Sequence, residues 1–297
     1  MLDEKEADQL VDDSHASFNN DLAKVFSAKG TKKASVYKVN RTFKTTFNGV
    51  SMKLPANQVE NLLKSEAVKA VYSDVEISAE PLVHAKDIAP EQMGLGMADE
   101  RSHLQVDKLH AEGHKGKGIK VGVLDTGIDY NHPYLKPAFK GGYDFIDNDN
   151  NPMETTYEDW KKSGKAEKNS SGNTYYTEQG THVSGTIGGR GANHSKYATT
   201  GITPEADLYA YRVLGPYGSG ATTGIIAALD KATEDGMDVI NMSLGSATND
   251  PMDVVSMAVN NAVLNGVTAV LSAGNSGDAI YIRYARCCSI SNYSGCK

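Results

Sequence analysis

Three polar residues stand where a catalytic apparatus for acyl transfer could assemble. Asp125 follows the apolar run at 119–124, His182 lies in "QGTHVSGTIGG", and Asn275 follows "VTAVLSA". A carboxylate can fix the tautomer of an imidazole, which can then take a proton from a nucleophile. A carboxamide can donate a hydrogen bond to the oxyanion that develops. The chain order Asp, His, amide therefore predicts nucleophilic attack on a carbonyl carbon.

Alternating strands and helices would bring these residues together. Apolar runs predict four strands, at 119–124, 208–213, 239–244 and 267–272. Amphipathic spacing predicts two helices, at 222–234 and 252–264. Such an alternation predicts a parallel sheet with right-handed crossovers. Ligands bind beyond the carboxyl ends of parallel strands, where Asp125 and Asn275 stand.

The first part of the chain reads as a small, separate α/β unit over residues 16–81. It comprises a predicted helix at 16–28, a hairpin at 35–54 with Asn48-Gly49 available for positive φ, a helix at 57–64 and a last strand at 68–77. The predicted organisation is an acidic segment at 1–15, this unit, a linker at 82–103, a larger domain at 104–278 and an atypical tail at 279–297.

Composition excludes several classes of protein. The chain has 297 residues and a net charge of −7 without a basic cluster, so we expect no nucleic acid partner. It has no run of about 18 apolar residues, so we expect no membrane span. The acidic start differs from a secretory signal, so no export signal is expected in this chain. All three cysteines, Cys287, Cys288 and Cys296, fall in the last eleven residues.

Five segments in order, "VGVLDTGIDYNHP", "GTHVSGT", "GITPEADLYAYRVL", "MDVINMSLGS" and "LSAGNSG", resemble the subtilisin-like serine peptidases. Within that family the chain is similar to the minor extracellular, multidomain proteases of Gram-positive bacteria. The resemblance implies an incomplete three-layer α/β domain with a parallel sheet, preceded by a ferredoxin-like α+β propeptide. It also implies a secreted serine endopeptidase precursor that acts on polypeptides, needs no cofactor and uses its propeptide as intramolecular inhibitor and chaperone.

The resemblance assigns catalytic roles to Asp125 and His182 and the oxyanion role to Asn275. Glycine-containing segments would form two edges that pair with an extended peptide substrate, and a third segment would form one wall of the pocket for the residue before the scissile bond. These substrate-binding residues are Gly218, Ser219, Gly220, Ser243, Leu244, Gly245, Ala273 and Gly274. The alternative is that these are ordinary turn glycines.

The sequence departs from the family pattern at several points. No Gly-Thr-Ser occurs, so the nucleophile serine is absent and we expect this chain to be inactive by itself. After Gly277 the amino-acid sequence shows no helix or strand periodicity. A frameshift or a mis-assigned gene end would explain this change, and a disulfide-bonded tail is the alternative. Gln179 stands where the family usually has a second histidine before "GTH", and Tyr134 stands where calcium-binding members place an aspartate.

Other chemistries remain as alternatives. Residues 147–151 with Glu158 follow an EF-hand register, but Pro152 occupies the glycine position, so we expect a solvated acidic loop there and keep calcium as the alternative. His110 and His114 lack the zinc-signature order. An apolar strand followed by "DTG" also occurs in aspartic proteases, but these need a second such carboxylate. A non-catalytic peptide-binding fragment is the further alternative.

Overall fold

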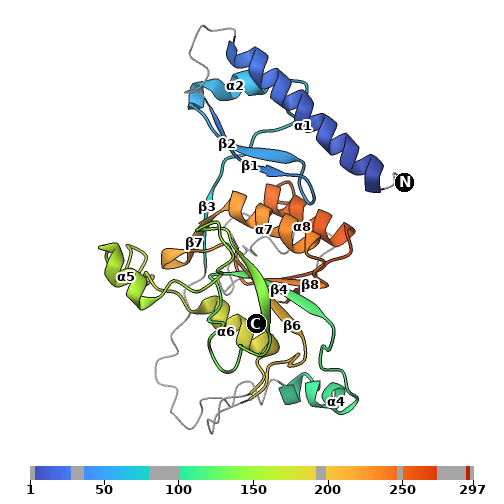
Figure 1. The fold of residues 1–297 in the computed structure, drawn as a ribbon, viewed down its shortest axis with the longest axis vertical. Helices are drawn as coiled ribbons and strands as arrows, with labels where there is room; N and C mark the ends of the chain where they lie inside the picture. Colours follow the sequence, from blue (N-terminus) through green and yellow to red (C-terminus); the bar gives the residue numbers. More distant parts are fainter. Residues whose placement is uncertain are drawn as a thin grey trace.

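The computed structural model describes residues 4–27, 37–79, 101–191, 199–245, 250–272 and 292–294. It shows a small N-terminal unit stacked on a larger α/β domain (Figure 1). Helices α7 (Thr222–Glu234) and α8 (Val254–Leu264) lie between this unit and the central sheet, whereas α6 (Gln179–Gly188) lies on the sheet's other side. No helix in these ranges is long and apolar enough to cross a membrane.

The central sheet of the larger domain is parallel throughout, in the order β10-β9-β8-β4-β6-β5. Its strands are β4 (Lys120–Asp125), β5 (Phe139–Asp144), β6 (Asp207–Arg212), β8 (Val239–Met242), β9 (Thr268–Ser272) and β10 (Asn292–Ser294). The predicted strands correspond to β4, β6, β8 and β9 with small differences at their ends. The core between this sheet and α7 and α8 contains fully buried Leu124, Ile225, Leu229 and Val259.

Strand β5 is an element that the sequence pattern did not predict. It contains Gly141 and Gly142, both with positive φ, and lacks a continuous apolar run. A Cβ at Gly142 would lie 1.8 Å from the carbonyl oxygen of Ala210 on the neighbouring strand, so only glycine fits this close approach. Glycines disfavour strands on average, so the strand propensity of this segment is low. The strand forms because of its tertiary contact with β6.

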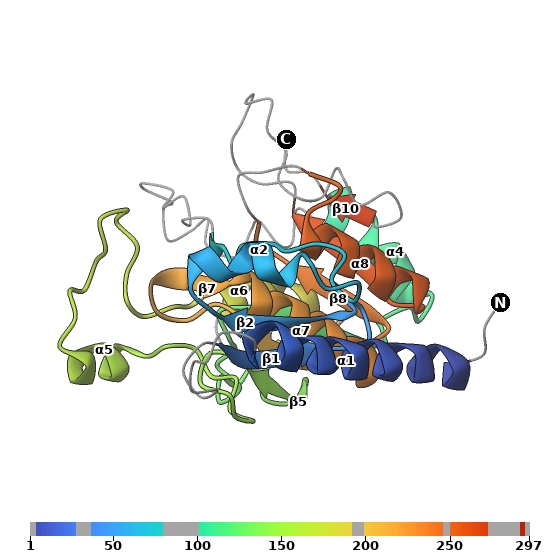
Figure 2. The same cartoon turned by 90° about the horizontal axis from the view of Figure 1, so that it is seen from above.

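The remaining short elements of the larger domain lie around this sheet. They are α4 (Val106–Ala111), α5 (Tyr157–Ser163), the 3-10 turn η4 (Pro216–Gly218) and strand β7 (Ser219–Ala221). Helix α5 begins with a capping box, in which Thr156 and Asp159 satisfy each other's backbone N–H groups, and it ends at Gly164 with φ 65°. Figure 2 shows α5 at the far side of the molecule from the N-terminus.

The N-terminal unit consists of helix α1 (Glu4–Ser27), the antiparallel hairpin β1 (Lys38–Phe43) and β2 (Gly49–Lys53), the turn η2 (Ala56–Gln58) and helix α2 (Val59–Leu62). Its small core joins Phe18, Leu22 and Phe26 of α1 to Leu62 of α2. The acidic residues predicted to form a separate segment at 1–15 are instead, from Glu4 on, the first half of α1. From residue 6 to residue 13 their charged side chains are exposed along the helix, so burial does not oppose helix formation there.

The last strand of this unit differs from the prediction. Only Glu76–Ser78 (β3) is a strand, and it pairs antiparallel with β7 of the larger domain instead of joining β1 and β2. The physical reason is the side chain of Ile77, which is 1% exposed and packs into the core of the larger domain. Residues 69–75 cross between the two units without regular structure.

Candidate active site

Asp125 is a buried acid at the carboxyl edge of the sheet, and its pKa is raised. It ends β4, is 1% exposed, and its Oδ1 accepts a hydrogen bond of 2.7 Å from the backbone N–H of Thr126. Burial raises the pKa of this carboxyl to about 8; the hydrogen bonds of Thr126 oppose that rise, and the nearby charge of Glu154 adds to it. Its other oxygen, Oδ2, is buried and has no hydrogen-bond partner of good geometry among the described residues.

The start of α6 is held against the turn that follows Asp125. The N–H of Gly180 donates to Oγ1 of Thr126 at 2.9 Å, and a Cβ at position 180 would lie 2.0 Å from the carbonyl oxygen of Gly127. Gly127 itself has φ 122°, a conformation that favours glycine. Two glycines therefore allow the helix to begin in direct contact with the Asp125 turn.

A buried acid, Glu154, fixes the same helix from the other side. Its Oε1 accepts hydrogen bonds from the N–H and Oγ1 of Thr181 at 2.9 and 3.0 Å, and its Oε2 accepts one of 2.6 Å from Oγ1 of Thr177. Glu154 is 7% exposed. Charge-assisted hydrogen bonds of this kind are strong, so the first turn of α6 is held rigidly. The sequence analysis missed Glu154, for which the motif gave no signal.

The structure does not bring His182 to Asp125. The imidazole is exposed, and no hydrogen bond or ion pair joins it to a described residue. The α6 side chain that reaches this place is Gln179, whose hydrogen bonding lowers the pKa of Asp125 and whose Nε2 donates to the carbonyl oxygen of Ser243 at 2.7 Å. The predicted residues Ala273, Gly274 and Asn275, like the three cysteines, lie outside the described residues.

Both predicted substrate edges lie beside the strand β3. Ile77 pairs with Gly220 and Ser78 with Ser219, while Ser78 also forms an antiparallel bridge to Gly245 on the opposite edge. The chain continues with Ala79, whose N–H donates to the carbonyl oxygen of Gly218 at 2.7 Å. The end of the N-terminal unit thus lies as an extended peptide between the two edges.

The same extended peptide is anchored at the N-terminus of α7. The carbonyl oxygen of Val75 accepts hydrogen bonds of 3.0 Å from both the N–H and the Oγ1 of Thr222. The carboxylate of Asp74 accepts from the N–H and Oγ1 of Thr223 at 3.1 and 3.0 Å. An acid at the first turn of a helix satisfies free N–H groups and interacts favourably with the helix dipole.

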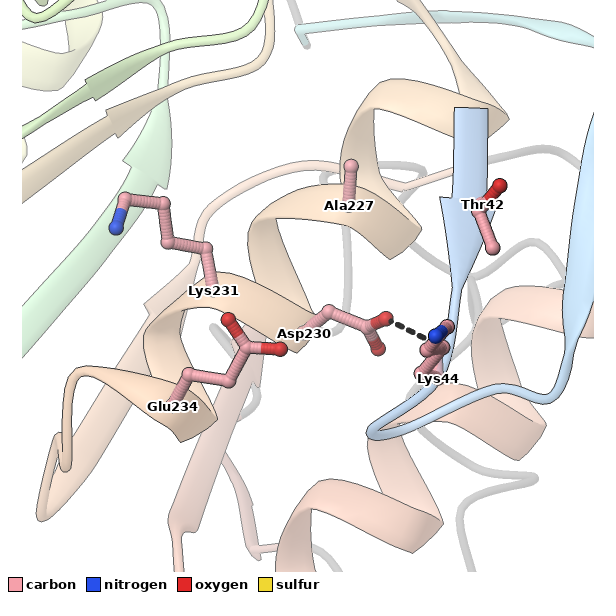
Figure 3. Close-up of a pocket in the computed structure, with 6 residues that line it drawn as sticks. All are labelled: Thr42, Lys44, Ala227, Asp230, Lys231 and Glu234. Atoms are coloured by element: carbon pink, nitrogen blue, oxygen red, sulfur yellow. Dashed lines mark hydrogen bonds between the residues drawn. The ribbon is translucent and has the colours of Figure 1, made fainter. Parts of the chain in front are cut away.

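A second contact joins the turn after β1 to α7 (Figure 3). The carboxylate of Asp230 accepts hydrogen bonds from the N–H groups of Lys44, Thr45 and Thr46 at 2.9, 3.3 and 2.7 Å, and from Oγ1 of Thr46 at 2.5 Å. The side chain of Thr46 is completely buried there. Sequence reasoning did not single out Asp230, although an acid that the helical pattern places beside Leu229 on a buried helix is a signal that could have.

Further contacts surround this docking site. Oγ1 of Thr45 donates to Glu234 at 2.7 Å, and the amide of Asn261 donates to the carbonyl oxygen of Thr46 at 2.8 Å. The guanidinium of Arg41 donates to the carbonyl oxygen of Phe145 and to Oδ1 of Asn148 at 2.8 and 2.7 Å. The N-terminal unit is therefore held at its hairpin as well as at its C-terminal strand.

The acidic loop considered for calcium is engaged in an ion-pair network. Nη1 of Arg212, on the buried end of β6, contacts carboxylate oxygens of Asp144 and Asp147 at 2.5 and 2.9 Å. Its Nη2 donates to Oγ1 of Thr155 at 2.7 Å. Within the described residues no group of three or more His, Cys, Asp or Glu could hold a metal ion. The expectation that the chain needs no cofactor, with calcium as the alternative, stays a prediction.

The parallel sheet, the buried aspartate at its carboxyl edge and the peptide held in a cleft beside it define the class as a subtilisin-like peptidase domain with its inhibitory propeptide. Residues 116–291 match the subtilase family, and residues 1–80 match the peptidase inhibitor I9 family. Since the first match covers more than half of the chain, the chain belongs to the subtilase family.

Individual relatives agree with this assignment. Over 281 residues the chain is 40% identical to the minor extracellular protease Vpr of Bacillus subtilis (strain 168), a match that covers 93% of this chain and 32% of that protein. It is 42% identical over 176 residues to the major intracellular serine protease of the same organism, covering 59% of this chain and 48% of the relative. The chain thus spans from about a third to about a half of these relatives.

A solved structure shows the same fold. The crystal structure of fervidolysin from Fervidobacterium pennivorans, a keratinolytic enzyme related to subtilisin, superposes with a TM-score of 0.59 and 22% sequence identity. The superposition covers 91% of this chain and 40% of the fervidolysin chain. The arrangement of an N-terminal unit followed by a parallel-sheet domain is therefore found in a known structure.

Proposed function

We propose that this chain is the propeptide and the first part of the catalytic domain of a subtilisin-like serine endopeptidase that acts on polypeptides outside the cell. The observation that carries the proposal is the strand Glu76–Ser78, which lies between the edges 219–221 and Gly245 as a peptide substrate would. The extracellular location rests on the name of the Vpr relative.

The pairing gives the cleft a chemical role. An extended backbone that pairs on both sides is held without regard to most side chains, so the cleft suits polypeptides in general. Its depth at Ile77, which is 1% exposed, adds one apolar subsite. Asp125 is the carboxylate that would orient and charge-stabilise a basic partner on α6, because it is buried at the end of β4 against the start of that helix. Asn275 remains the proposed oxyanion donor.

The N-terminal unit would act as an intramolecular inhibitor and as a folding chaperone. Residues 76–79 fill the cleft, so a substrate cannot pair with the same edges until they leave. The hairpin contact at Asp230 joins that unit to α7, an element of the catalytic domain's core. Contacts of this kind would stabilise α7 during folding. Without a Gly-Thr-Ser segment in its sequence, the chain would hold peptides and leave them intact.

Displacement of the inhibitory strand tests the proposal. Ile77→Glu places a charge in a buried apolar site, so the strand should leave the cleft. We expect this variant to bind a fluorescein-labelled peptide of sequence VEISA, measured by anisotropy, at least tenfold more tightly than the native chain. Val71→Glu is the matched control, since Val71 is 41% exposed in the segment before the strand, and it should bind as weakly as the native chain. Equal binding by Ile77→Glu and Val71→Glu would overturn the proposal.

A further inference from the structure

An arm of the chain, residues 157–177, extends outward from the body of the larger domain (Figures 1 and 2). It consists of α5 and the irregular segment that follows this helix. Two hydrogen bonds close its base: the N–H of Thr177 donates to the carbonyl oxygen of Thr155 at 2.9 Å, and the N–H of Thr155 donates to Oγ1 of Thr177 at 3.1 Å. Residues 164–168 of the arm are exposed, so apolar burial does not hold them in place.

Hydrogen bonds from aromatic residues hold this exposed segment instead. The carbonyl oxygens of residues 165, 166 and 167 each accept one bond. The donors are Nε1 of Trp160 at 3.1 Å, the hydroxyl of Tyr217 at 2.6 Å and the backbone N–H of Tyr175 at 2.7 Å. Trp160 and Tyr175 belong to the arm itself, whereas Tyr217 belongs to the turn η4. Tyr217 therefore links the arm to another part of the domain.

Tyr217 has two further contacts with the arm. Its N–H donates to the carbonyl oxygen of Tyr175 at 3.1 Å, and the two rings lie 5.2 Å apart at 80° to each other. Its φ of 61° lies in the left-handed region, which is unfavourable for a residue with a large side chain. The contacts with the arm offset this cost, because they are available only while the tyrosine keeps its place.

The residue after Tyr217 begins the first peptide-holding edge. The carbonyl oxygen of Gly218 accepts the hydrogen bond of 2.7 Å from the N–H of Ala79, and Ser219 pairs with Ser78. Because Tyr217 directly precedes this edge, a change in its backbone conformation would move the carbonyl oxygen of Gly218. The far end of the same edge is fixed separately, at the start of α7, where the N–H of Thr222 donates to the carbonyl oxygen of Val75.

We propose that Tyr217 is a positioning residue of the cleft, through which the arm sets the place of the edge 218–221. This inference rests on the proposed function, because it gives the arm a role in holding a peptide. The arm holds the hydroxyl, the ring and the N–H of Tyr217, and Tyr217 in turn fixes the backbone against which the peptide pairs. Loosening this link should release the end of the peptide at Ala79 before the end at Val75.

Hydrogen exchange of two amides, resolved by NMR in the full chain, tests the proposal. The amide of Ala79 reports the end of the edge beside Tyr217, and the amide of Thr222 reports the far end. Tyr217→Phe loses only the hydroxyl bond to the arm, so exchange at Ala79 should be about fivefold faster. Exchange at Thr222 should keep its native rate.

Tyr217→Asn separates the arm contacts from the backbone conformation. Asparagine tolerates a positive φ but is too short to replace the ring and hydroxyl contacts. We expect exchange at Ala79 to be about tenfold faster in this variant, again without change at Thr222. A native rate at Ala79 in both variants, or equal acceleration at Ala79 and Thr222, would overturn the proposal. If Tyr217→Asn does not fold, Tyr217→Phe decides alone.

The matched control is Tyr176→Phe, which loses a hydroxyl bond of 3.0 Å to Glu167 within the arm. It leaves the link at Tyr217 intact, so exchange at Ala79 should stay within about twofold of the native rate. Acceleration at Ala79 as large as in Tyr217→Phe would contradict a specific role of Tyr217.

Trp160 reports the arm side of the link, because it is the one tryptophan of the sequence and its indole is bonded to residue 165, beside the carbonyl oxygen that Tyr217 holds. Quenching of its fluorescence by acrylamide should rise about twofold in Tyr217→Asn, since residues 165 and 166 lose an anchor. Unchanged quenching would show that the arm does not depend on Tyr217 and would overturn the proposal.

These outcomes are separable from failure of the proposed function. Binding of the VEISA peptide by Ile77→Glu is measured with Tyr217 and the arm intact, so it reports the cleft alone. Peptide binding together with native exchange at Ala79 in the Tyr217 variants would uphold the cleft and refute the positioning role. Absence of peptide binding together with selective acceleration at Ala79 would do the reverse.

Discussion

The carboxylate of Asp230 should be the main electrostatic link between the hairpin of the propeptide and the catalytic domain. It accepts four hydrogen bonds from residues 44–46 and is 7% exposed. Each hydrogen bond to a charged group contributes about 1.5–3 kcal/mol, but the four share one carboxylate and are not additive. We therefore expect Asp230→Ala to cost about 4 kcal/mol, because it leaves several donors without an acceptor at a largely buried site, each at a cost of about 1–3 kcal/mol.

A cost of this size corresponds to about a 10³-fold increase in the population of the open hairpin turn. Trypsin cleavage after Lys44 reports that population, because the enzyme can cut the bond only when the turn has left α7. We expect Asp230→Ala to speed this cleavage, followed by mass spectrometry, by about 10³-fold at low protease concentration.

The control for this experiment is Glu234→Gln. Glu234 accepts a single hydrogen bond from Thr45, and its side chain is exposed on the same helix. Exposed contacts contribute about 0–1 kcal/mol, so cleavage should rise less than about fivefold. If Asp230→Ala is cleaved no faster than Glu234→Gln, the hydrogen-bond cluster does not hold the propeptide and the reasoning is refuted.

Three further substitutions test the site and the sheet, each by urea unfolding. Because the folded Asp125 carboxyl keeps its proton up to about pH 8 and the unfolded one loses it near pH 3.8, stability should fall between these values, by about 1.4 kcal/mol per pH unit. Asp125→Asn should remove that slope, and an unchanged slope would contradict the assigned pKa. Gly180→Ala should cost about 1–3 kcal/mol since the new Cβ meets Gly127 O; native-like stability would show that α6 can shift freely. Arg212→Met should cost about 3–5 kcal/mol by leaving Asp144 buried and unpaired; a smaller loss would mean that the pair contributes little.

The parallel sheet could be predicted because buried parallel strands are continuous apolar runs. The runs before Asp125 and at 208–213 correspond to β4 and β6, and the amphipathic helix at 222–234 coincides with α7. Strand β5 was not predicted, because its Gly142 is required by a close contact with Ala210. Ala210 lies about 70 residues away in the sequence, so this contact produces no local pattern. Local periodicity reports burial but not which partner provides it.

The site was predicted in part for a similar reason. Asp125 could be found because a carboxylate directly after a buried strand must lie at the sheet's carboxyl edge. The sequence motif assigned the catalytic role to His182, but it could not show whether residue 182 or residue 179, one turn earlier on nearly the same face of α6, faces that carboxylate. The difference is made by Thr126 and Glu154, which hold the start of the helix from two other segments of the chain.

The propeptide strand illustrates a third limit. Alternation predicted a strand at 68–77, yet the strand that forms is Glu76–Ser78, and its partner is in another domain. Pairing partners are set by tertiary contact at Ile77, not by the alternation itself.

Amide hydrogen exchange along the propeptide tail tests the central claim most directly, namely that residues 76–79 occupy the cleft as a paired strand. Peptides ending at residues 75 and 79 can be compared in the native chain by mass spectrometry. We predict strong protection of residues 76–79, whose N–H groups pair with the cleft edges, and fast exchange over residues 69–74, which have no strand partner. Exchange at 76–79 as fast as at 69–74 would contradict the account.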